Sequence, residues 1–219
     1  MNHGSNRYPP TGPELLVQYG CGLVAPTSWL NFDASPTLRF ERVPVLGRLY
    51  KRNEHRFPDN VRFGNILHAP LVPEGSARAI YASHVLEHLS LSDLRIALQH
   101  TRFMLRPGGT FRLVVPDLRH MASEYLASAA PEAAIEFVRA TGMGRESRPR
   151  SLYGKLRDLL GNVPHLWMWD AESLTVELKH AGFPLVQQKS YGNWSDPRFA
   201  DVEVEDRLNS AFALEASCS

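Results

Sequence analysis

Short apolar runs alternate with amphipathic stretches along the chain. Seven apolar runs predict β-strands, at residues 15–19, 29–33, 61–66, 77–82, 110–116, 185–191 and 212–216. Helices are predicted at 36–52, 90–105, 118–126, 131–142, 152–160 and 170–182, where apolar residues recur at helical spacing or capping residues flank the segment. Strands that alternate with helices are typical of a mostly parallel sheet covered by helices, the α/β class.

Length and composition fit one soluble domain. The chain has 219 residues, of which 43% are hydrophobic, enough for one substantial core. Residues 1–13 are polar and rich in proline and glycine, so we expect a flexible N-terminus without a signal peptide. Residues 14–219 are expected to form a single domain. It carries an irregular insertion at about 141–164, which is either a basic lid or a solvated loop.

Charge and cysteine content narrow the functional classes. The formal net charge is +1, which gives no reason to expect a nucleic-acid or membrane-surface partner. Cys21 and Cys218 form no disulfide framework, and no segment is apolar enough to span a bilayer. A cytoplasmic protein with a small-molecule partner is therefore expected, and the sequence leaves its oligomeric state open.

The residues just after the strands are the candidates for ligand binding, because ligands of such sheets lie beyond the carboxyl ends of the strands. Gly20-Cys21-Gly22 follows the first strand, and glycines there let the backbone approach a ligand, although so short a motif taken alone favours a plain structural turn. Asp33 ends the second strand and could accept hydrogen bonds from a ribose diol. Asp33 follows Gly20 by only 13 residues, so the first helix is shortened or missing. An NAD enzyme needs that helix for its pyrophosphate, whereas a cofactor without phosphates does not.

Two further sets follow the third and fourth strands. Asn65-Ile66-Leu67 could read an adenine edge, with an apolar side chain against the ring. Ser83 and His84 follow the fourth strand, and His84 is the first candidate for a general base because histidine titrates near neutral pH. His165 is the second candidate.

Several longer strings point to one family. They are the strand-GCG-WLNFD region (16–33), SHVLEHL (83–89), LRPGG (105–109) and HLWMWD (165–170) followed by a helix ending in AGF. Together they resemble class I S-adenosylmethionine-dependent methyltransferases, in a small type 11-like subgroup. The resemblance implies a Rossmann-like seven-stranded sheet with helices on both faces, an antiparallel seventh strand and S-adenosylmethionine as cofactor.

The resemblance also implies roles for individual residues. The cofactor's methionine part would lie at Tyr19, Gly20, Cys21 and Gly22, its ribose at Asp33, its adenine at Asn65, Ile66 and Leu67, and its methyl group near Ser83 and His84. No metal ligand is expected.

Two alternatives remain at this stage. The truncated glycine motif allows a methyltransferase-like protein that binds the cofactor without catalysis. His84-x-x-Glu87-His88 also spells H-x-x-E-H, which on a helix could hold zinc in a metallopeptidase. Its position between a strand and a glycine turn argues against that reading, and His88 is more simply a packed helix residue.

Overall fold

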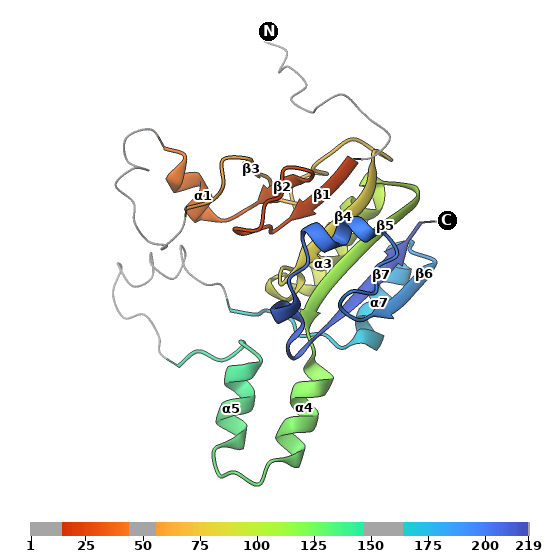
Figure 1. Ribbon diagram of the computed structural model, residues 1–219. Coiled ribbons are helices and arrows are strands. Elements are labelled where there is room, and N and C mark those ends of the chain that lie inside the picture. The colour runs from red at the N-terminus through yellow and green to blue at the C-terminus, as the bar shows by residue number, and fades with distance from the viewer. Residues whose placement is uncertain (1–14, 44–55, 147–163, 219) are drawn as a thin grey trace.

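The computed structural model describes residues 15–43, 56–146 and 164–218, and its centre is a seven-stranded sheet (Figure 1). The strands are β1 Leu15–Tyr19, β2 Leu30–Asp33, β3 Val61–Phe63, β4 Ala77–Ser83, β5 Leu105–Pro116, β6 Leu185–Lys189 and β7 Ala211–Ser217. All seven predicted strands are confirmed, although β3 is shorter than predicted and ends before Asn65.

The order of the strands is β3-β2-β1-β4-β5-β7-β6. The first five pair in parallel, and β7 runs antiparallel to both of its neighbours, β5 and β6. This order and the reversed β7 confirm the predicted Rossmann-like methyltransferase sheet. The carboxyl ends of β1, β2, β3 and β4 therefore meet at one edge, where the candidate residues lie.

The apolar faces of α3 (Leu91–Met104) and α7 (Ala171–His180) cover one side of the sheet. α3 begins at Ser90, whose hydroxyl accepts a hydrogen bond from the backbone N–H of Asp93. Leu94 and Leu98 of α3 are fully buried against the strands, which confirms the helical pattern predicted there.

The opposite side of the sheet is covered by residues 194–208, which contain the 3₁₀ helices η2 (Pro197–Asp201) and η3 (Glu205–Leu208). Phe199 and Val202 from this segment pack against Trp29 and Tyr81. The apolar pattern of the sequence did not predict this layer, because its residues have neither strand nor helix periodicity.

Three other helices lie around the edge of the sheet: α1 (Pro36–Glu41), α4 (Leu118–Ala127) and α5 (Ala133–Ala140). In Figure 1, α4 and α5 form a hairpin that projects from the carboxyl end of β5. No helix of the described ranges has the length and apolar character needed to cross a membrane.

Several details differ from the sequence-based expectations. Residues 20–29 contain turns and no helix, so the first helix is absent rather than shortened. The predicted glycine turn at 106–109 is a bulge inside β5, because Leu105 pairs with Ala77 and Thr110 with Ala79. The expected N-terminal segment, the helix at 152–160 and most of the 141–164 insertion lie outside the described residues.

Candidate functional site

The turn after β1 is tied directly to the end of β2. Gly20 and Gly22 both have left-handed backbones, with φ of 64° and 54°. The N–H of Gly22 donates to Oδ2 of Asp33 (3.0 Å), and Oδ1 of Asp33 accepts from the N–H of Ser35 (2.7 Å). The structure thus brings two of the predicted cofactor-binding elements together, with remaining lone pairs on the carboxylate.

The side chains of Tyr19 and Cys21 are both buried. Tyr19 is buried, and its hydroxyl lies 3.2 Å from the hydroxyl of Thr101 on α3. The ring of Tyr19 is thus directed toward α3, and its backbone is the part that adjoins the glycine turn. Burial, together with the charge of Asp33, raises the pKa of the Cys21 thiol to about 12, so Cys21 is a small packed residue and no nucleophile.

The residues after β3 form a compact turn. Oδ1 of Asn65 accepts a hydrogen bond from the N–H of Leu67 (2.9 Å), and Ile66 is buried in the main core. The carbonyl of Ile66 accepts a hydrogen bond of 2.6 Å from Nδ1 of His100 on α3. The amide of Asn65 is therefore partly engaged by its own turn, and Leu67 is only partly buried beside it.

His84 stands at the end of β4 in an unusual conformation. Its φ is 55°, a left-handed value that is uncommon outside glycine. Its Nε2 donates to the carbonyl of Arg207 (2.8 Å), and the guanidinium of Arg207 donates to the carbonyl of Ser83 (3.3 Å). Burial lowers the pKa of His84, but its contacts with Glu87 and the Arg207 carbonyl outweigh burial and hold the pKa above its ordinary value.

Val85, the residue after His84, packs against Gly20 and so links the turn after β1 to the end of β4. A Cβ atom added to Gly20 would lie 2.2 Å from Cγ2 of Val85. A small hollow at the same place is lined by Gly20, Cys21, Ser83 and Arg207, among others. Arg207 is a site residue that the sequence analysis missed, since it lies 123 positions from His84 and no local pattern marks it.

Glu87 is the second residue that sequence reasoning missed. Its carboxylate is fully buried, 3.3 Å from Nδ1 of His84 and 4.0 Å from Nε2 of His165. The rings of His88 and His165 meet edge to face, with centroids 4.8 Å apart. The two predicted histidines thus converge on one carboxylate, which the sequence analysis named only as part of the H-x-x-E-H string.

The metallopeptidase reading of this motif lacks the helix that it requires. His84 has a left-handed backbone, and only Leu86–His88 form a single 3₁₀ turn, η1. His84 and His88 therefore do not lie one α-helical turn apart.

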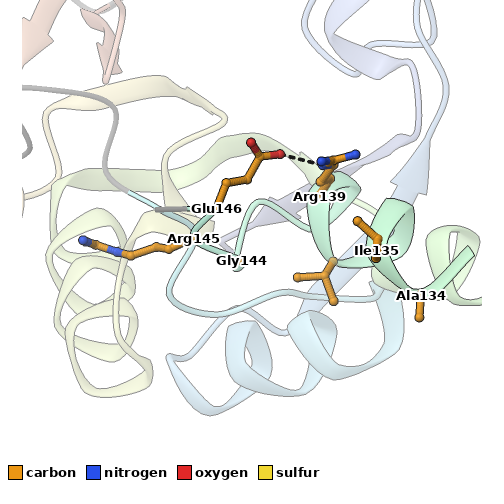
Figure 2. A pocket seen from close by; sticks show the side chains of 7 residues that line it. Ala134, Ile135, Arg139, Gly144, Arg145 and Glu146 are labelled. Atoms are coloured by element: carbon orange, nitrogen blue, oxygen red, sulfur yellow. Dashed lines mark hydrogen bonds and ion pairs between the residues drawn. The ribbon is translucent and has the colours of Figure 1, made fainter. Parts of the chain in front are cut away.

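A larger groove lies elsewhere, with a volume of about 570 Å³ (Figure 2). Its lining comes from α5 and the following loop, including Ile135, Arg139 and Glu146, and Arg139 and Glu146 form an ion pair of 2.6 Å. None of the strand-end residues predicted to hold the cofactor contributes to it, so it is separate from the candidate site.

The family can now be assigned. A family model described as a methyltransferase domain matches residues 14–188. The chain belongs to this methyltransferase family. The assignment confirms a class I methyltransferase with S-adenosylmethionine as cofactor, and it supports neither the non-catalytic alternative nor the metallopeptidase.

Several solved structures are similar to this methyltransferase at low identity. One is a SAM-dependent methyltransferase from Archaeoglobus fulgidus, with 12% identity, a TM-score of 0.46, and coverage of 94% of this chain and 86% of that one. A possible histamine N-methyltransferase from Thermotoga maritima has 14% identity, a TM-score of 0.49 and coverage of 94% and 82%. Human N-acetylserotonin methyltransferase in complex with SAM has 15% identity, a TM-score of 0.46 and coverage of 95% and 48%. No curated protein sequence matches the chain significantly.

The residues of the methyltransferase fit its cofactor. A Cβ atom on Gly22 would meet no atom within 4 Å, so the turn beside Asp33 faces open space. That space adjoins a buried carboxylate suited to a diol, and no helix N-terminus is needed because S-adenosylmethionine carries no phosphate.

Proposed function

We propose that this methyltransferase transfers a methyl group to a small-molecule acceptor bound at the carboxyl edge of the sheet, beside His84 and His165. The observation that carries the proposal is the hydrogen bond between the Gly22 N–H and the Asp33 carboxylate, which joins the ends of β1 and β2. When bound there, S-adenosylmethionine supplies an electrophilic methyl group, whose bond electrons return to sulfur as the acceptor's lone pair forms the new bond.

Each part of the cofactor is assigned to the residues at the end of one strand. We assign the Gly20-Cys21-Gly22 backbone to the methionine part, Asp33 to the ribose, and the turn at Asn65, Ile66 and Leu67 to the adenine. Ser83 and His84 follow the central strand β4 and are assigned to the neighbourhood of the methyl group. Most of the rate enhancement would then come from holding acceptor and methyl group in line.

The cluster of His84, Glu87 and His165 is proposed to handle the acceptor's proton. Each histidine has one ring nitrogen bonded to a backbone carbonyl and the other facing Glu87. Such a group is useful when the acceptor atom is a hydroxyl, which must lose a proton as it is methylated.

The proposal also includes a small-molecule acceptor and a cytoplasmic location. The near-neutral charge favours a small acceptor over a nucleic acid, because phosphate backbones select basic surfaces. Cys21 and Cys218 are both buried free thiols, which is ordinary in a reducing compartment.

The cofactor site is tested by titrating the protein with S-adenosylmethionine and S-adenosylhomocysteine in a calorimeter. We expect saturable binding of both, and Asp33→Asn should weaken both at least tenfold, because hydrogen bonds to a charged group are worth about 1.5–3 kcal/mol. Asp59→Asn, at an exposed carboxylate paired with Arg42, is the matched control and should bind like the wild type. Equal affinities for wild type and Asp33→Asn would remove Asp33 from the site.

The proton-handling cluster is tested with His84→Asn and His165→Asn. Asparagine tolerates the left-handed backbone of His84, so the fold should survive. With methyl-labelled cofactor and a panel of phenols, amines and carboxylic acids, we expect turnover to fall about 100-fold or more while cofactor affinity stays unchanged. Unchanged turnover on an accepted substrate, with both variants folded, would contradict the assignment.

A further inference from the structure

The carboxylate of Glu87 is fully buried and faces the imidazole rings of His84 and His165. Its side chain is fully inaccessible, and neither oxygen makes a hydrogen bond of good geometry with the described residues. The backbone of the same residue is firmly held, since its carbonyl accepts from the N–H groups of Leu166 (2.7 Å) and Trp167 (3.1 Å). A buried carboxylate is costly unless a cation or hydrogen-bond donors compensate it, and the His84 contact at 3.3 Å reaches only one of its oxygens, so the site suits a cation.

The nearby histidines are oriented as metal ligands are. Nδ1 of His165 lies 2.7 Å from the carbonyl of Thr141, and a carbonyl can only accept, so Nδ1 carries the proton. The lone pair of His165 is then on Nε2, which faces Glu87 at 4.0 Å. Histidines that bind metals almost always donate their other ring N–H to a backbone carbonyl or carboxylate.

His84 repeats the same arrangement from the other side. Its Nε2 donates to the carbonyl of Arg207, which leaves Nδ1 facing the same oxygen of Glu87 at 3.3 Å. A proton on Nδ1 would satisfy this one contact as an ion pair. That ion pair would not explain why His88 and His165 also lie close to the Glu87 carboxylate.

His88 supplies the third ligand. One ring nitrogen of His88, one of His165 and a carboxylate oxygen of Glu87 all lie within 4.8 Å of one another. Ligand atoms around a tetrahedral zinc ion are ~3.3 Å apart, since each lies about 2.0–2.2 Å from the metal. The three ligand atoms need to approach one another by up to about 1.5 Å to reach that spacing.

We propose that Glu87, His88 and His165 bind a divalent transition-metal ion of the Zn²⁺ type, with Nδ1 of His84 beside the same carboxylate. The sequence analysis expected no metal here, and the new assignment rests on the convergence of these groups. Two imidazoles and one carboxylate suit Zn²⁺ better than Mg²⁺ or Ca²⁺, which prefer oxygen ligands.

The metal also has a place in the reaction, and this role rests on the proposed function. A three-ligand site leaves a coordination position open. A metal held by these residues would lower the pKa of an acceptor hydroxyl, whose proton would pass to solvent before the oxygen takes the methyl group from sulfur. The cation would thus take over the acid–base role for which the sequence suggested His84 or His165.

Metal binding is tested on untagged protein that has been stripped with a chelator and dialysed. Zn²⁺ is titrated in competition with a chromophoric chelator, and Co²⁺ is added to a second sample for its visible spectrum. We expect one equivalent of tight Zn²⁺ and the intense Co²⁺ bands of a tetrahedral site. Glu87→Gln and His165→Gln should each weaken Zn²⁺ at least tenfold, and His165→Gln, at a partly exposed side chain, remains informative if Glu87→Gln fails to fold.

His120→Gln is the matched control, because His120 and Glu124 form an exposed histidine–glutamate contact of 3.4 Å on α4. It should leave Zn²⁺ affinity unchanged. The metal site is overturned if the wild type shows no saturable equivalent, or if His165→Gln binds Zn²⁺ as tightly as the wild type. Titration of the same stripped protein with S-adenosylmethionine separates the two proposals, since retained cofactor binding without metal binding contradicts the metal site alone.

Discussion

Arg112→Met is expected to destabilise the protein by about 3–5 kcal/mol, the usual cost of removing one partner from a buried ion pair. Arg112 is fully buried in β5 and donates to both oxygens of Glu203 (2.7 and 2.9 Å) and to Glu215 of β7 (2.9 Å). Without the guanidinium, two buried carboxylates lose their counter-charge and keep only neutral donors, Trp194 for Glu203 and Ser195 for Glu215. Urea unfolding monitored by circular dichroism measures the loss.

Two comparison variants show whether the loss of stability comes from the buried charges. Arg95→Met removes an exposed arginine that contacts both oxygens of Glu177 (2.8 Å each), and exposed pairs contribute little, so only a slight effect is expected. The triple variant Arg112→Met, Glu203→Gln, Glu215→Gln should recover part of the stability, because no buried charge is left. A loss for Arg112→Met no larger than for Arg95→Met would show that the network does not stabilise the fold.

The same network has a functional consequence. Glu203 belongs to the segment that covers one face of the sheet and leads into η3, where the carbonyl of Arg207 holds His84. Arg112 therefore anchors the segment that fixes the ring of His84. Residual folded Arg112→Met is expected to keep its cofactor affinity better than its turnover, since Asp33 lies on the other side of β1.

The strands and the cofactor edge could be predicted because they depend on local pattern. Strand runs such as 15–19 are set by burial of consecutive apolar residues, and the position of Asp33 at the sheet edge follows because it ends β2. The partners of Arg112 could not be predicted, since Glu203 and Glu215 lie 91 and 103 positions away. Nothing in a sequence marks two distant carboxylates as neighbours of one arginine.

The direction in which a side chain points was also beyond the sequence. Tyr19 ends β1 next to the glycine turn, yet alternation along the strand turns its ring toward α3. Glu87 stood in the H-x-x-E-H string, which would hold zinc only on a helix, whereas His84 has a left-handed backbone and the Glu87 carboxylate is buried. Both residues needed the three-dimensional arrangement to be placed.

The two glycines of the turn after β1 should respond differently to alanine, because only one of them has a close neighbour. Gly20→Ala is expected to cost about 2–5 kcal/mol, the sum of a left-handed alanine (about 1–2 kcal/mol) and overpacking against Val85 (about 1–3 kcal/mol). Gly22→Ala meets no atom, so its loss should be confined to the backbone cost of about 1–2 kcal/mol. Urea unfolding of both variants checks this order.

Cofactor affinity should also respond differently to substitution at Gly20 and at Gly22. The Cβ atom of Gly22→Ala enters the open space beside Asp33, so S-adenosylmethionine should bind at least tenfold more weakly to a protein that remains folded. In the double variant Gly20→Ala, Val85→Ala the overpacking is relieved, and a coupling of about 1–3 kcal/mol relative to the single variants is expected. Full cofactor affinity in Gly22→Ala would mean that this turn does not face the cofactor. An absence of coupling between Gly20→Ala and Val85→Ala would mean that the Val85 side chain can move aside without loss of stability. The two results together test a separate reason for each glycine. The geometry indicates that position 20 is glycine so that β1 can pack against Val85 after β4, and that position 22 is glycine to leave room for the ligand.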